Sequence, residues 1–225
     1  MLIFYLMIGM ILFSFGDCYS YRKSKGMNYL TDRSRCESCG HVLKWFELLP
    51  LVSYLALRGK CRYCGRQISL RPFLSEVIGL VCGGIAYSKG FVALFILCNL
   101  YVLALMDQKT KSVPFVSCIP LLLICIIVSY MDLDLFSRLF GSLLISVPMS
   151  LLNVIKKDSF GWGDVILFLL LGYIYKIDII YIALLALGIA SLYALYLMGI
   201  LKKTKEYEFA FIPFLFLGVL LYLLL

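Results

Sequence analysis

Long apolar runs dominate this 225-residue chain and limit the folds that are open to it. Inside a bilayer every backbone polar group must be bonded within the protein, so runs this long and this numerous are satisfied by helices. Several are shorter than the roughly 20 residues of an upright span, which tilt or local thinning accommodates. We predict an all-α polytopic membrane protein with about eight transmembrane helices, at 2–20, 73–87, 91–106, 114–131, 135–155, 165–175, 179–201 and 209–225.

The first run is interpreted as a retained helix, because it lacks the basic start and the small-residue cleavage site of a secretory signal. The basic residues predict the orientation. If 22–71 is cytoplasmic and eight spans alternate, the inside segments 22–71, 108–113, 156–163 and 202–208 hold 18 of the 21 Lys and Arg residues. The positive-inside rule then places both termini outside.

The net charge of +8 indicates a partner class. The charges lie in loops between apolar runs rather than on a solvated domain with stacking aromatic residues, which argues against nucleic acid. Anionic lipid head groups are the expected partners.

Two aspartates, Asp107 and Asp164, lie at the margins of apolar runs and, in this topology, at the same cytoplasmic depth. A charged side chain costs about 2.5 to 3.5 kcal/mol at the centre of the bilayer, so such a residue is a candidate functional group. The glycines Gly161 and Gly163 precede the second aspartate in a GxGD string, where they leave room for a substrate backbone. We therefore predict that the two carboxylates form one site that shares a proton.

The alternative is that each aspartate only caps a helix at the head-group layer. Asp17 and Glu76 also lie near the cytoplasmic ends of predicted spans, and they remain rivals for a functional role. Asp158 is better explained as a solvated loop charge.

Four cysteines in two C-x-x-C pairs, Cys36/Cys39 and Cys61/Cys64, follow the first run with 21 residues between the pairs. This spacing predicts a structural zinc site with four thiolate ligands, in a small zinc-ribbon-like insertion. His41 could replace one ligand, but with four thiols present it is expected at the surface. Thiol redox chemistry is the rival interpretation, and a cytosolic position with glycine after each pair favours the closed metal site.

The chain is expected to divide into a first helix (1–21), a cytoplasmic zinc-binding domain (22–72) and a seven-helix domain (73–225). The zinc domain has 11 basic and 3 acidic residues between Arg22 and Arg71, which favours adsorption to anionic lipid. Metal would supply folding free energy that so small a segment lacks. The aromatic and leucine residues at 45–50 are expected to pack internally or against lipid, with a substrate groove as the alternative.

Together these features resemble the type 4 prepilin peptidase family, the bifunctional leader peptidases and N-methyltransferases of type IV pilus, competence and type II secretion systems. The resemblance covers nearly the whole chain. It rests on the order and spacing of Ser14-Phe15, the two cysteine pairs, segments 49–55, 58–64 and 68–72, Glu76, Asp107, Val113-Pro114, the GxGD string and segment 212–214.

The resemblance implies an aspartyl protease of the bacterial inner membrane in which Asp107 and Asp164 activate a water and cleave the basic leader of a prepilin or pseudopilin. It also implies methylation of the new amino terminus with S-adenosylmethionine, and Glu76 with the cysteine pairs matches the region associated with that activity. A basic leader would be repelled by the basic zinc domain, so Glu206 and Glu208 are weak candidates for leader contact.

The chain departs from the family pattern at Asp17-Cys18, Arg71, Phe115 and Ile166. None of these positions is a predicted aspartate or cysteine ligand, so they bear on methylation more than on cleavage. Two other classes stay open. One is a non-catalytic zinc-bearing assembly factor, and the other is a membrane thiol oxidoreductase that uses the cysteine pairs.

Overall fold

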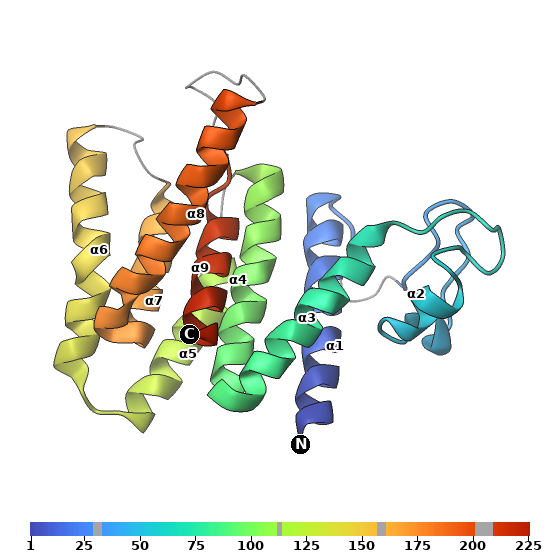
Figure 1. Cartoon of the computed structure of the whole chain (residues 1–225), viewed down its shortest axis with the longest axis horizontal. Coiled ribbons are helices and arrows are strands. Elements are labelled where there is room, and N and C mark those ends of the chain that lie inside the picture. The colour runs from blue at the N-terminus through green and yellow to red at the C-terminus, as the bar shows by residue number, and fades with distance from the viewer. Residues whose placement is uncertain (29–32, 112–113, 157–160, 201–208) are drawn as a thin grey trace. The chain divides into compact units, whose positions relative to one another are not determined.

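The structure is a computed structural model that describes residues 1–28, 33–111, 114–156, 161–200 and 209–225 (Figure 1). Within these residues there is no named strand, only the isolated bridges Arg35–Val42 and Lys60–Gln67. The prediction of an all-α chain is confirmed. The long helices are α1 (Leu2–Ser24), α3 (Leu70–Lys89), α4 (Phe91–Thr110), α5 (Ile119–Met131), α6 (Leu135–Ile155), α7 (Trp162–Tyr175), α8 (Ile179–Gly199) and α9 (Ile212–Leu224).

Short helical elements complete the fold: η1 (Trp45–Leu48), α2 (Val52–Ala56), η2 (Phe115–Cys118) and η3 (Lys176–Asp178). Five stretches of the described chain are long and apolar enough to cross a membrane: Leu2–Ser24, Leu70–Lys89, Phe91–Thr110, Leu135–Ile155 and Trp162–Gly199. The last of these contains both α7 and α8, and Phe115–Met131 and Ile212–Leu224 are shorter apolar helices. The chain is therefore a multi-pass membrane protein, while the number of eight crossings stays a prediction.

The chain forms two compact units, Met1–Cys98 and Asn99–Leu225. In the first unit α1 packs along α3 through glycines. A Cβ atom added to Gly79 would lie 2.5 Å from the carbonyl oxygen of Gly9, and one added to Gly83 would overlap the carbonyl oxygen of Tyr5. Because glycine has no side chain, the two backbones approach closely, as at other helix interfaces in membranes.

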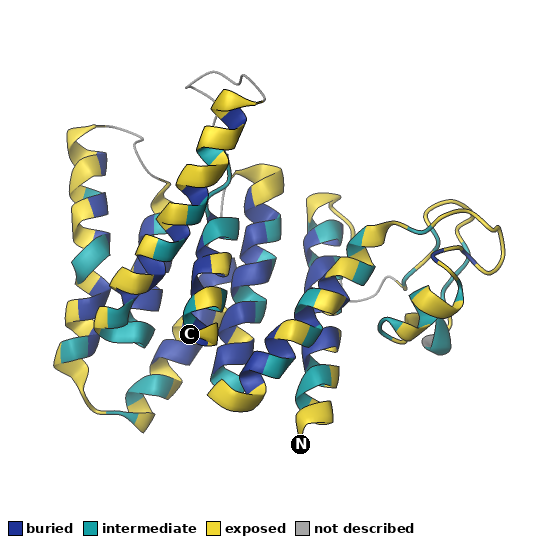
Figure 2. Cartoon of the chain, in the orientation of Figure 1, coloured by how far each residue is buried: buried dark blue, intermediate teal, exposed yellow. Residues whose placement is uncertain are grey.

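The second unit uses the same kind of contact between α6 and α7, where Gly141 and Gly172 meet backbone to backbone. Its core is built from leucine and isoleucine side chains that are fully buried, including Leu103, Leu121, Leu167, Leu171, Ile182 and Ile212. Figure 2 shows exposed residues along the outer side of α6. Many of these are large apolar side chains, as expected for a surface that faces lipid.

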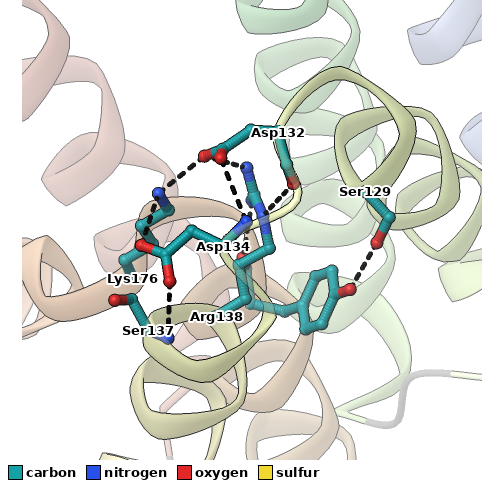
Figure 3. Close-up of polar contacts among 7 residues, drawn as sticks. Ser129, Asp132, Asp134, Ser137, Arg138 and Lys176 are labelled. Atoms are coloured by element: carbon teal, nitrogen blue, oxygen red, sulfur yellow. Dashed lines mark hydrogen bonds and ion pairs between the residues drawn. The ribbon is translucent and has the colours of Figure 1, made fainter.

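A polar cluster joins the C-terminal ends of α5 and α7 to the start of α6 (Figure 3). Arg138 is only 3% exposed, and its guanidinium donates to the Asp132 carboxylate (2.9 Å) and to the carbonyl oxygen of Tyr173 (3.2 Å). Lys176 donates to the carboxylates of Asp132 (2.6 Å) and Asp134 (3.4 Å). This clasp, defined as Asp132, Asp134, Arg138 and Lys176, ties three helix ends together at the end of α7 away from Asp164.

Candidate functional site

Asp107 lies on α4, three residues before the helix ends at Thr110, and is 8% exposed. Its Oδ2 accepts a 3.1 Å hydrogen bond from the backbone N–H of Ile212, the first residue of α9. The first N–H groups of a helix have no partner inside the helix, so the start of α9 supplies a donor to the carboxylate. The Ile212 amide is thus part of the site, and sequence reasoning had given it no role.

Asp164 lies in the first turn of α7, whose N-cap is Gly161. The predicted span began one residue after Asp164, whereas the helix begins two residues before it. A Cβ atom on Gly161 would stand 3.2 Å from Oδ2 of Asp164, so glycine keeps the space beside this carboxylate open.

The two aspartates belong to the same unit although they are far apart in the sequence. The Asp164 carboxylate lies close enough to Asp107 for the two charges to interact. Two neighbouring carboxylates of this kind can hold and transfer a proton, which is the chemistry of general acid and base catalysis.

The four cysteines of the two C-x-x-C pairs also come together, with all Sγ atoms within 4.8 Å of one another. The Sγ atoms of Cys36 and Cys64 are 3.9 Å apart, near the edge of about 3.8 Å that a tetrahedron with Zn–S bonds of about 2.3 Å would have. Hydrogen bonds from the backbone N–H groups of Cys39 and Ser38 lower the pKa of the Cys36 thiol to about 6. At Cys39, the backbone hydrogen bond from His41 is outweighed by desolvation and the neighbouring thiols, which raise the pKa to about 11, so the four thiols share their protons as a group. These residues fit a four-thiolate metal ion.

Each cysteine pair is shaped by a glycine-ended turn. Gly40 donates to the carbonyl oxygen of Cys36, and Gly65 donates to that of Cys61, both at 2.9 Å. The two glycines have φ of 70° and 69°, a backbone conformation that other residues rarely adopt. His41 is not among the four clustered ligands; its ring lies 3.5 Å from that of Tyr63.

Glu76 is buried in the first unit, at 8% exposure. Its Oε1 accepts a 3.0 Å bond from the Ser14 hydroxyl of α1, and its Oε2 accepts a 2.7 Å bond from the backbone N–H of Leu51. Leu51 caps α2 with a φ of 58°. Glu76 therefore joins α1 and α3 to the segment that carries the cysteines.

The other rival acid, Asp17, is also buried, and its Oδ1 accepts a 2.7 Å bond from Nε of Arg71. Glu206 and Glu208, which were predicted as weak leader contacts, lie outside the described residues.

Comparison of the sequence with models of known protein families places this chain in the class of membrane leader peptidases. Residues 7–89 match the Bacterial Peptidase A24 N-terminal domain, and residues 94–225 match the Type IV leader peptidase family. The chain belongs to the type IV leader peptidase family.

Several curated relatives are similar to this chain, and the three described here are each called a prepilin leader peptidase/N-methyltransferase. The one from Vibrio cholerae is 28% identical, with 85% of each chain covered. That from Pseudomonas aeruginosa is 34% identical over 67% of this chain and 56% of its own length. That from Bacillus subtilis is 26% identical, with 93% of this chain and 89% of the relative covered.

The chain thus spans a little over half the length of the Pseudomonas relative. No solved structure matches it significantly.

Proposed function

We propose that this protein cleaves the basic leader peptide from type IV prepilins or pseudopilins, with Asp107 and Asp164 as the catalytic pair. The proposal is supported by the charge interaction between Asp107 and Asp164, which both lie in the part of the chain that matches the leader peptidase family. Its relatives are named for the same activity.

In the proposed mechanism the two carboxylates share one proton and titrate as a pair. The ionised partner draws a proton from water, and the protonated partner polarises the scissile carbonyl group. The Ile212 N–H holds one oxygen of Asp107 in place, and the absence of a side chain at Gly161 leaves space for a peptide beside Asp164.

The family and the apolar helices indicate a multi-pass protein of the bacterial inner membrane. We propose that both termini lie outside and that the aspartates and the four cysteines lie at the cytoplasmic face, because that topology puts 18 of the 21 Lys and Arg residues inside. A basic leader then stays in the cytosol, where Glu206 and Glu208 remain candidate contacts. The other proposed partners are anionic membrane lipids, and nucleic acid is not expected.

We also propose that Cys36, Cys39, Cys61 and Cys64 hold a structural Zn²⁺ ion. The division into 1–21, 22–72 and 73–225 is retained as a proposal, with the metal stabilising the middle part.

The second proposed activity is N-methylation of the new amino terminus. S-adenosylmethionine would supply the methyl group when bound. The two oxygens of Glu76 accept bonds from Ser14 and Leu51, which hold the carboxylate between α1 and the cysteine-bearing segment. We therefore propose that Glu76 acts in methylation by holding α1, α3 and the cysteines in place.

The test of cleavage is to replace Asp107 and Asp164 singly by Asn and to coexpress each variant with a prepilin. Leader cleavage should be abolished while the zinc content stays unchanged. Asp178→Asn is the matched control, because Asp178 lies in η3, beyond the end of α7 that is far from Asp164. Cleavage near the wild-type rate by either catalytic variant would show that the assignment is wrong. Intact mass measurement of the product would decide methylation.

The metal proposal is tested separately with Cys61→Ser, which should lose bound zinc, and Cys18→Ser, which should keep one ion per chain. One metal that protects four thiols from titration would exclude the thiol oxidoreductase alternative. The assembly-factor alternative would be supported if zinc is bound and no prepilin is processed.

A further inference from the structure

Four large apolar side chains project outward from the segment that carries the cysteines, residues 33–69, hereafter the cysteine segment. They are Leu48, Leu49, Val52 and Leu55, and together they are called the apolar edge. Val52 and Leu55 on α2 are 61% and 64% exposed. Neighbouring apolar side chains with this much exposure mark an interaction surface rather than a surface made for water.

Two contacts fix the apolar edge beside α3. The N–H of Leu51 donates to Oε2 of Glu76, and the ring of Tyr54 lies 4.8 Å from that of Phe73. Both partners on α3 belong to its first two turns. The start of α2 is therefore attached to the first two turns of α3. Figure 1 shows α2 within the looped segment between α1 and α3.

The position of this attachment along α3 indicates how far the apolar edge would lie from the end of the helix. Glu76 follows Leu70, the first residue of α3, by six residues, which is about 9 Å along the axis at 1.5 Å per residue. The 20 residues of α3 are about 30 Å long, close to the thickness of the hydrocarbon core. If the hydrocarbon core begins at Leu70 and α3 crosses it, the attachment at Glu76 would put the apolar edge level with the outer part of the acyl chains.

The exposed face of α3 is apolar from its first residue. Leu70 is 60% exposed, Leu74 is 54% exposed and Val81 is 45% exposed. A helix that is long and apolar enough to cross the membrane presents such a face to lipid. The apolar edge, attached to the first two turns of α3, adds further exposed apolar side chains beside this face.

The charges of the cysteine segment complement a lipid surface that is anionic. Its described residues include seven basic residues and two acidic ones, Glu37 and Glu47. Arg58, Lys60 and Arg62 follow α2 and are all exposed. Basic side chains near the membrane are attracted to anionic head groups.

We propose that the apolar edge inserts into the protein's own membrane at the boundary between head groups and acyl chains, with the exposed basic residues on anionic phospholipid head groups. Interfacial elements of this kind sit about 5 to 10 Å deep, which agrees with the attachment at Glu76. The proposal specifies the lipid contact of the cysteine segment and does not depend on which residues cleave the leader.

The test uses full-length protein in vesicles of phosphatidylcholine and phosphatidylglycerol that carry bromine on their acyl chains, which quenches tryptophan on contact. The native Trp45 and Trp162 are replaced by Phe, and one reporter is introduced at a time. Leu55→Trp should lose most of its fluorescence, and Leu74→Trp on α3, the lipid-facing control, should do the same. Ser38→Trp, exposed in a cysteine turn, should keep its fluorescence. Val52→Trp gives a second, independent reading of the apolar edge.

Three outcomes would overturn the proposal. If the fluorescence of Leu55→Trp and of Val52→Trp is not quenched by the bromolipid, the apolar edge faces water. If the emission of these two reporters changes when prepilin is added but not with bromolipid, the apolar edge is a contact surface for the substrate. If quenching is equal with and without phosphatidylglycerol, the basic residues do not bind anionic head groups as proposed. Adding Asp107→Asn should leave quenching unchanged, which separates this test from that of the peptidase.

Discussion

Asp17 and Arg71, two positions at which the chain departs from the family pattern, are bonded to each other. Nε of Arg71 donates to Oδ1 of Asp17 at 2.7 Å, and the same guanidinium donates to the Asp17 carbonyl oxygen at 3.3 Å. The Asp17 side chain is 7% exposed and the Arg71 side chain is 31% exposed. The pair joins α1 to the first turn of α3.

Removing one partner of this pair should cost more than removing both. Arg71→Gln removes the guanidinium that donates to the buried Asp17 carboxylate, and we expect a loss of about 2 kcal/mol of stability, between the values for exposed and buried ion pairs. The double variant Asp17→Asn/Arg71→Gln should recover at least half of that loss. Denaturant unfolding in detergent measures both, and strictly additive single effects would contradict the expected coupling.

The hydrogen bond from Ile212 to Asp107 should affect the rate of cleavage. Replacing the backbone amide at 212 by an ester removes the N–H while keeping the isoleucine side chain. We expect kcat to fall about tenfold or more with little change in KM, since a hydrogen bond to a charged group contributes about 1.5 to 3 kcal/mol. Ile212→Val keeps the N–H and is the control. An unchanged kcat in the ester variant would remove this amide from the site.

Adjacent glycines on α3 should respond differently to alanine. A Cβ atom at Gly83 would overlap the backbone of Tyr5, whereas at Gly84 the nearest atom is Cδ2 of Leu6 at 3.8 Å, an ordinary contact. Gly83→Ala should therefore destabilise the α1–α3 pair by about 1 to 3 kcal/mol. Gly84→Ala should be neutral or slightly stabilising, because alanine favours helix. Thermal unfolding in detergent compares the two, and equal melting temperatures would contradict this packing.

The clasp should make stability depend on pH. The hydrogen bond from Lys176, followed by that from the backbone N–H of Asp134, lowers the pKa of Asp132 to about 2. A lowered pKa means that the contribution is fully present above the ordinary aspartate value and is lost as the pH falls towards 2. Asp132→Asn should thus lower the melting temperature at neutral pH, and its difference from the wild type should shrink between about pH 4 and pH 2. A difference that does not change with pH would argue against the ion pair.

Much of the fold could be predicted because apolar runs and loop charges are properties of the sequence itself. The ends of the helices were predicted less well. The first run was expected to end at residue 20, yet α1 continues through Arg22 and Lys23 to Ser24. The predicted boundary was placed where the apolar residues stop. Charged residues with long side chains also favour helix, so the helix itself continues past that point.

The cysteines were predicted from their spacing, and the structure clusters their four Sγ atoms. The aspartates were predicted from their places at the margins of apolar runs, and their role as a pair stays a prediction. The Ile212 and Leu51 contacts could not be predicted in this way, because backbone N–H groups donate in both and every residue except proline has one. The positive φ of Leu51 has no sequence signal either, since leucine rarely adopts it. The spacing of Gly79 and Gly83 is a signal for close helix packing that sequence reasoning did not use.

The contacts of Glu76 bear on the order in which parts of the first unit can join. Its two oxygens bind Ser14 and Leu51, which both precede it in the chain. The cysteine segment is therefore synthesised before the helix that anchors it, and the N–H of Leu51 can acquire its partner only once Glu76 on α3 has been made. Because one carboxylate accepts from both α1 and the start of α2, a chain in which α3 is misplaced would leave the cysteine segment without this attachment.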